Sequence, residues 1–137
     1  MNNEEIMTSV ELEIILKAGK ILLSSGAEIS RTEDTMNYIA RAMNFKDLEA
    51  YVSNRGIFAT AKKADGTEIT RICNVPEVDI NLSKIESVNA LSRRITQKNI
   101  TIEEIESELN QIDTMSDYSF FWRLVAYTLG ASGFSYA

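Results

Sequence analysis

Apolar side chains recur at helical spacing near the start of the chain, from about residue 9 to residue 25. With 3.6 residues per turn they fall on one broad face of a helix. The residues of this face are Leu12, Ile15, Leu16, Gly19, Leu22 and Leu23. Thr8 and Glu11 have the spacing of a capping box at its start, and Gly26 suits the left-handed residue that ends a helix.

A second helix is expected to start near Ser30. Its buried stripe consists of Met36, Ile39, Ala40 and Met43. Ser30 and Glu33 have the spacing of another capping box. The acids Glu33 and Asp34 suit the positive end of the helix dipole, so we expect both in the first turn.

The middle of the chain changes to the pattern of strands. Residues 48–53, 56–63 and 67–75 are rich in β-branched and aromatic side chains. Ala64-Asp65-Gly66 is a favourable hairpin turn between the last two strands. Pro76 cannot donate a hydrogen bond and should end the third strand. We expect a small antiparallel sheet with the first two helices covering one face.

Two further helices follow the strands. The third is capped near Asn81, and its apolar face consists of Leu82, Ile85, Val88, Leu91 and Ile95. The fourth begins with Thr101 and Glu104 as a capping box, flanked by Ile100 and Ile105 as a hydrophobic staple. Together the elements predict one α+β domain in the order ααβββαα.

Residues 116–137 differ from the hydrophilic domain of residues 1–115. An aromatic cluster typical of a membrane interface opens this segment: Tyr118, Phe120, Phe121 and Trp122. The apolar stretch after Arg123 would span roughly 21 Å as a helix at about 1.5 Å per residue. That is shorter than a hydrocarbon core of roughly 30 Å. The segment is either a core helix of a soluble domain or the beginning of a first transmembrane helix in a truncated chain, and we favour the second.

The composition excludes several classes of function. The net charge of -6 is unfavourable for non-specific nucleic-acid binding. The chain has no histidine and one cysteine, Cys73, which excludes Ser-His and Cys-His nucleophile pairs and zinc sites of the usual ligands. No cofactor is expected, and only a hard cation bound by carboxylates remains open. Residues 1–9 lack the features of a signal peptide, so the amino terminus should be cytoplasmic.

Charged residues gather where the first helix turns into the second. These candidates for a binding site are Glu28, Arg31, Glu33 and Asp34. A forked guanidinium binds a carboxylate and an acid binds an ammonium group, so the corner suits a small zwitterion or a dicarboxylate. The structural alternative is capping with a surface ion pair, or an ion pair of Arg31 that holds the domain together.

Arg71 lies on an otherwise apolar face of the third strand, where an arginine usually has a carboxylate partner. We expect this partner to be Glu28, Glu33 or Asp34.

The remaining candidates lie in or next to the third helix and are Asn81, Asn89 and Arg93. Asn81 is expected to cap the helix. Asn89 and Ser92 share a face beside the apolar stripe, where polar side chains more often satisfy nearby backbone than bind a ligand. Arg93 and its neighbour Arg94 could face anionic lipid or a loop of a membrane protein.

Four groups of residues occur in an order that resembles a known family. They are Ser25-Gly26-Ala27-Glu28 with Arg31 and Glu33-Asp34; Asn54-Arg55-Gly56-Ile57-Phe58; Arg71; and Asn81-Leu82 leading to Asn89-Ala90-Leu91-Ser92-Arg93. The chain is similar, over roughly residues 10–137, to the hydrophilic amino-terminal domain of the bacterial threonine/serine exporter family.

The resemblance implies the cytoplasmic amino-terminal part of an inner-membrane exporter of threonine, serine or a related small metabolite. Export would be driven by an ion gradient, and this domain would gate, assemble or sense substrate. The implied partners are the membrane, the remaining transmembrane bundle, a small-molecule substrate and a second copy of the chain, without nucleic acid. The domain is not expected to be an enzyme. Two alternatives stay open: a soluble carboxylate-based enzyme, hydrolase-like or dependent on a divalent cation, and a ligand-free interaction module.

Overall fold

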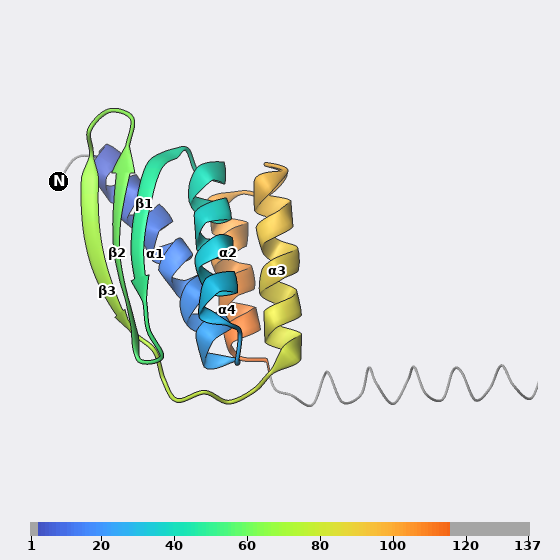
Figure 1. The fold of residues 1–137 in the computed structure, drawn as a ribbon. Helices are drawn as coiled ribbons and strands as arrows, with labels where there is room; N and C mark the ends of the chain where they lie inside the picture. The colour runs from blue at the N-terminus through green and yellow to red at the C-terminus, as the bar shows by residue number, and fades with distance from the viewer. Residues whose placement is uncertain (1–2, 116–137) are drawn as a thin grey trace, which may run out of the picture.

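The computed structural model describes residues 3–115. Helices and strands follow one another in the predicted order ααβββαα, which confirms the α+β fold (Figure 1). Their bounds are α1 Asn3–Ser24, α2 Ile29–Ala42, β1 Phe45–Val52, β2 Gly56–Lys63, β3 Glu68–Asn74, α3 Leu82–Thr96 and α4 Ile102–Asp113. The membrane helix expected in residues 116–137 lies outside the described residues. Within residues 3–115, no helix combines the length and the apolar character that a membrane crossing requires.

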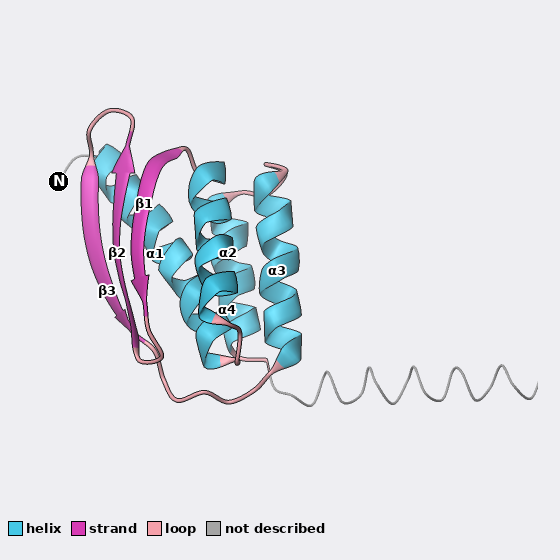
Figure 2. Cartoon of the chain, in the orientation of Figure 1, coloured by secondary structure: helices cyan, strands magenta, loops and turns pink. Residues whose placement is uncertain are grey.

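The three strands form one antiparallel sheet in the order β1-β2-β3. Helices α1 and α2 cover one of its faces, as predicted (Figure 2). On β2, the buried residues Ile57, Ala59 and Ala61 alternate with the more exposed Phe58 and Thr60. This period of two is what a sheet with one covered face requires.

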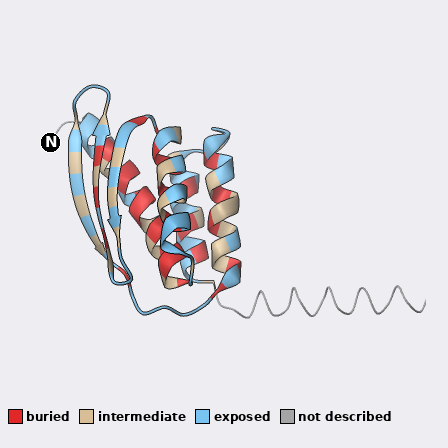
Figure 3. Ribbon diagram, in the orientation of Figure 1, coloured by how far each residue is buried: buried red, intermediate tan, exposed pale blue. Residues whose placement is uncertain are grey.

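Helix α1 is the centre of the fold. It packs against β2 and β3 on one side and against α2, α3 and α4 on the others. Burial therefore extends along most of this helix (Figure 3). Leu12 and Ile15 have no exposed surface, and Ile21 is 1% exposed. A helix that is apolar on most sides is expected in such an interior position.

The predicted start of α1 was wrong, because the helix already begins at Asn3. Thr8 is therefore inside the helix, and its hydroxyl donates to the Glu4 carbonyl at 2.8 Å. Glu11 is not a capping residue either, since its carboxylate forms an ion pair with Lys63 at 3.0 Å. The acids that suit the positive end of the helix dipole are Glu4 and Glu5.

The end of α1 agrees with the prediction. Gly26 has a φ of +101°, which is the left-handed conformation that glycine adopts at little cost. The Ala27 N–H donates to the Leu22 carbonyl at 3.0 Å, and the Gly26 N–H donates to the Leu23 carbonyl at 3.1 Å. These two bonds are a Schellman motif, and they turn the chain directly into α2.

The capping box predicted for α2 was wrong. The helix begins at Ile29 with Glu28 as its N-cap, and Glu28 makes no side-chain capping hydrogen bond. Ser30 is already helical, and the first turn contains no acid, so Glu33 and Asp34 lie further along the helix than predicted. The Schellman turn ends α1 so close to Ile29 that no room is left for a separate cap at Ser30.

The remaining local signals were mostly correct. Asp65 accepts a hydrogen bond from the Thr67 N–H at 2.9 Å in the β2–β3 turn, and this bond lowers the pKa of the Asp65 carboxyl. Asn81 caps α3 and Thr101 caps α4 through side-chain oxygens. In a capping box the Glu104 side chain would accept from the Thr101 backbone N–H. Here its carboxylate accepts from the Thr101 hydroxyl at 3.1 Å.

Strand β1 begins at Phe45, three residues before the predicted start, because the chain enters the sheet almost directly from α2. Two residues, Met43 and Asn44, lie between them, and the φ of 65° at Asn44 makes this tight connection possible.

Candidate functional site

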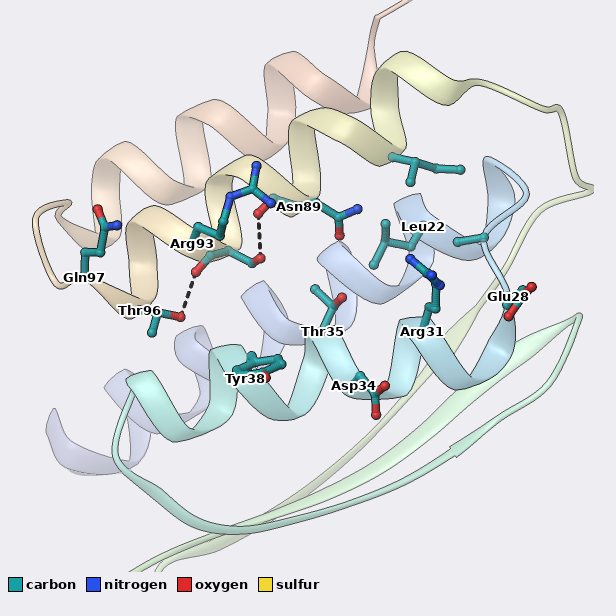
Figure 4. Close-up of a pocket in the computed structure, with 13 residues that line it drawn as sticks. Leu22, Glu28, Arg31, Asp34, Thr35, Tyr38, Asn89, Arg93, Thr96 and Gln97 are labelled. Atoms are coloured by element: carbon teal, nitrogen blue, oxygen red, sulfur yellow. Dashed lines mark hydrogen bonds between the residues drawn. The ribbon is translucent and has the colours of Figure 1, made fainter.

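An open groove of about 870 Å³ lies between α2 and α3 (Figure 4). Five of the eight candidate residues line it, and they are Glu28, Arg31, Asp34, Asn89 and Arg93. Helices α2 and α3 are in contact, although the three strands separate them in the sequence. The fold therefore brings the charged corner together with the polar face of α3.

The turn after α1 positions the charged end of this groove. Glu28 is the N-cap of α2, and Arg31 follows within the first turn of the helix. Leu22, Ala27 and Ile85 add apolar surface to the lining at this end. In Figure 4, Arg31 extends from α2 towards the side of Leu22 and α3.

Helix α3 contributes a row of polar residues at intervals of three and four. Asn89 and Ser92 lie in this row, followed by Thr96. The Ser92 hydroxyl donates to the Asn89 carbonyl at 2.8 Å, and the Thr96 hydroxyl donates to the Ser92 carbonyl at 2.9 Å. These hydroxyls satisfy the backbone, as expected for polar residues beside a core. The side-chain amide of half-buried Asn89 extends in the direction of Arg31 (Figure 4).

The charged groups of the groove face solvent. Glu28, Arg31, Asp34 and Arg93 are all exposed. Neither arginine has an ion-pair partner within residues 3–115, where Lys63 pairs with Glu11 and Arg94 with Glu108. The ion pair expected for Arg31 is therefore not formed in this part of the chain. Asp34 lies on the outer side of α2, turned away from α3 in Figure 4.

The carboxylate partner predicted for Arg71 was wrong. One guanidinium nitrogen of Arg71 donates to the Ser9 hydroxyl at 3.1 Å, and another donates to the Thr70 carbonyl at 2.9 Å. The inner face of β3 packs on α1, where Ser9 lies, whereas the acidic candidates belong to the α2 region on the far side of the fold.

Two other candidates also lie outside the groove lining. Asn81 is buried and structural: its side chain accepts from the Lys84 N–H at 3.1 Å and donates to the Met115 carbonyl at 3.3 Å. Glu33 is half-buried, and its carbonyl accepts a hydrogen bond from the Asn37 side chain at 3.0 Å.

Sequence reasoning missed two residues of α2 that line the groove, Thr35 and Tyr38. Their positions four and seven residues after Arg31 place them on the same helix face, so helical periodicity could have identified them. It also missed Thr96 and Gln97 at the end of α3, which follow Arg93 by three and four residues and carry the same helical signal.

No group of three or more potential metal-ligating side chains (Asp, Glu, Cys or His) occurs among the described residues.

Comparison with protein families shows which family the chain belongs to. The family model described as "Putative threonine/serine exporter" (ThrE) matches residues 13–137. The chain belongs to this family. Neither the curated proteins nor the solved structures contain a significant match to the chain. Membership of an exporter family implies transport and a membrane location, and such a family consists of transporters rather than enzymes.

Proposed function

We propose that residues 1–115 form the cytoplasmic domain of an exporter of threonine, serine or a related small metabolite, and that residues 116–137 begin its first membrane helix. In this proposal the domain senses cytoplasmic substrate in the groove between α2 and α3 and gates export accordingly. The sensing proposal rests on one observation: Glu28, Arg31 and Asn89 line the same groove.

The groove contains groups complementary to an amino-acid zwitterion. The Arg31 guanidinium can bind the carboxylate in forked geometry, and the Glu28 carboxylate can accept from the ammonium group. Asn89 and Thr35 offer further hydrogen bonds, and Leu22 offers apolar contact for a methyl group. The two contacts with Arg31 and Glu28 together require both charges of the ligand.

Affinity should be low, because the charged groups are exposed and water competes for them. We expect a Kd on the order of 1 mM, equivalent to about -4 kcal/mol. A sensor with such an affinity would respond only when the substrate accumulates in the cytoplasm.

The test is an NMR titration of the chain with threonine and with serine, followed through the amide signals of α2 and α3. Chemical-shift changes should be concentrated at residues 28–35 and 85–93. N-acetylthreonine and threonine amide each lack one of the two charges and should bind at least tenfold more weakly, since each loses a charge-assisted contact.

Arg31→Gln and Glu28→Gln should remove binding while leaving the fold intact, because both side chains are exposed. The matched control is Arg55→Gln, which changes an exposed arginine in the β1–β2 turn, outside the groove lining. A titration without any shift at high millimolar threonine or serine would overturn the sensing proposal and favour the ligand-free interaction module.

A further inference from the structure

One end of the domain exposes four aliphatic side chains, Ile29, Val78, Ile80 and Leu82. Their exposed fractions are 37%, 55%, 66% and 49%. We call them the aliphatic patch. They lie where α1 turns into α2 and where the β3–α3 linker reaches α3, at the end of the molecule that is lowest in Figure 1.

Backbone hydrogen bonds hold this patch in place. The Asp79 N–H donates to the Ser24 carbonyl at 2.8 Å, and the Asn81 N–H donates to the Ser25 carbonyl at 3.0 Å. A Cβ added at Gly26 would lie 3.4 Å from the Ile80 side chain, so the linker rests directly on the turn after α1. The exposed aliphatic side chains are thus fixed features of the surface.

The chain continues towards residue 116 from the same end. Asn81, between Ile80 and Leu82, donates from its side chain to the Met115 carbonyl at 3.3 Å. Tyr118 follows Met115 by three residues, so the chain between them spans at most about 11 Å. Tyr118 opens the aromatic cluster that is typical of a membrane interface. If this cluster lies in the interface, the aliphatic patch lies within reach of it.

We propose that the aliphatic patch contacts the lipid surface and so fixes the orientation of the domain on the membrane. This inference rests on the proposed membrane attachment through residues 116–137. The acids Glu28, Glu77 and Asp79 are exposed at the same end of the molecule. Contact should therefore depend on the burial of aliphatic side chains and not on attraction to anionic headgroups.

The test uses the full chain with one environment-sensitive label. Cys73, the only cysteine, is replaced by serine, and a nitrobenzoxadiazole label is attached to Ile80→Cys. The matched control is Ile6→Cys, an isoleucine with 46% exposure in the amino-terminal part of α1, away from the patch. Circular dichroism and thermal melting of each labelled variant establish that the fold is retained.

With phosphatidylcholine vesicles, the label at position 80 should gain intensity severalfold, shift to shorter wavelength and be quenched by spin-labelled lipid. The label at position 6 should do none of these. Replacing a third of the lipid by phosphatidylglycerol should not strengthen the response. In unlabelled protein, Ile80→Ser should weaken vesicle binding roughly threefold to tenfold through lost burial, whereas Ile6→Ser should leave it unchanged.

The single tryptophan, Trp122, reports separately on attachment. If vesicles shift the Trp122 emission but leave the label at position 80 unchanged, the patch proposal is overturned, while the proposed membrane attachment through residues 116–137 is supported. If neither responds, both are overturned. A response at position 80 that grows with protein concentration without lipid would show that the patch binds a second copy, which also contradicts lipid contact. None of these outcomes affects the threonine titration of the groove.

Discussion

Lys63 connects four elements of the fold, and its replacement by methionine should cost about 3 kcal/mol of unfolding free energy. Its ammonium group lies 3.0 Å from the Glu11 carboxylate of α1 and donates to the Met43 carbonyl at 2.7 Å. It also lies 4.4 Å from the centre of the Phe45 ring. Lys63→Met keeps most of the aliphatic stem and removes only these polar contacts.

The magnitude follows from the burial of the pair. Only 19% of the Lys63 side chain and 12% of the Glu11 side chain are exposed. Removing one partner of a buried ion pair costs roughly 3–5 kcal/mol, because the other charge stays buried alone. The remaining exposure argues for the lower end of that range. A loss of about 3 kcal/mol should lower the Tm by roughly 10 °C in a domain of this size.

The assay is urea unfolding followed by circular dichroism, with wild type, Lys63→Met, Glu11→Met and the double variant. The double variant should recover most of the loss, to within about 1 kcal/mol of wild type, because no unpaired charge remains. Arg94→Met is the control. Its pair with Glu108 is 45% and 32% exposed and should contribute no more than about 1 kcal/mol. Two results would refute this reasoning. One is a loss of unfolding free energy below about 1 kcal/mol for Lys63→Met. The other is a double variant whose loss equals the sum of the losses of the two single variants.

Further outcomes follow from backbone geometry and titration. Gly26→Ala should cost about 1–2 kcal/mol in thermal unfolding because of the left-handed φ. Gly19→Ala should also destabilise, by about 1 kcal/mol, since the added methyl would approach the Met36 sulfur to 2.7 Å and outweigh the gain in helix propensity. Desolvation raises the pKa of the Cys73 thiol. The stabilising effect of the neutral Cys73 thiol is therefore present below the pKa of the unfolded state and is lost as pH rises through the pKa of the folded state. Alkylation of Cys73 at pH 8 should be slower in the folded protein than in protein unfolded by urea. The Asp65 pKa is lowered, so its stabilising effect should disappear as pH falls through the folded value, and its NMR midpoint should lie below that of the unfolded chain.

Local hydrogen bonding made much of the fold predictable from the sequence. The caps at Asn81 and Thr101 and the left-handed Gly26 depend on residues within one turn of themselves. Such preferences act without tertiary structure, so helix ends could be inferred from them. The antiparallel sheet could be inferred from β-branched segments joined by a tight turn. The capping box predicted at Thr8 was wrong because the same spacing of Thr and Glu also occurs inside a helix, and α1 extends to Asn3.

The candidate site was only partly predictable. Glu28, Arg31 and Asp34 stood out because a plain helical corner does not require them, and the polar face of α3 was visible from periodicity. That these two groups line one groove depends on the packing of α2 against α3, which no local pattern specifies.

Long-range polar partners were decided by the tertiary structure alone. Arg71 binds Ser9 and Lys63 binds Glu11 because α1 crosses the inner face of β2 and β3. The sequence by itself determined which segments become helices or strands and which faces are apolar, since these follow from neighbouring residues. The pairing of charges across elements follows from the relative placement of packed faces, and apolar packing sets that placement without regard to which charges it brings together.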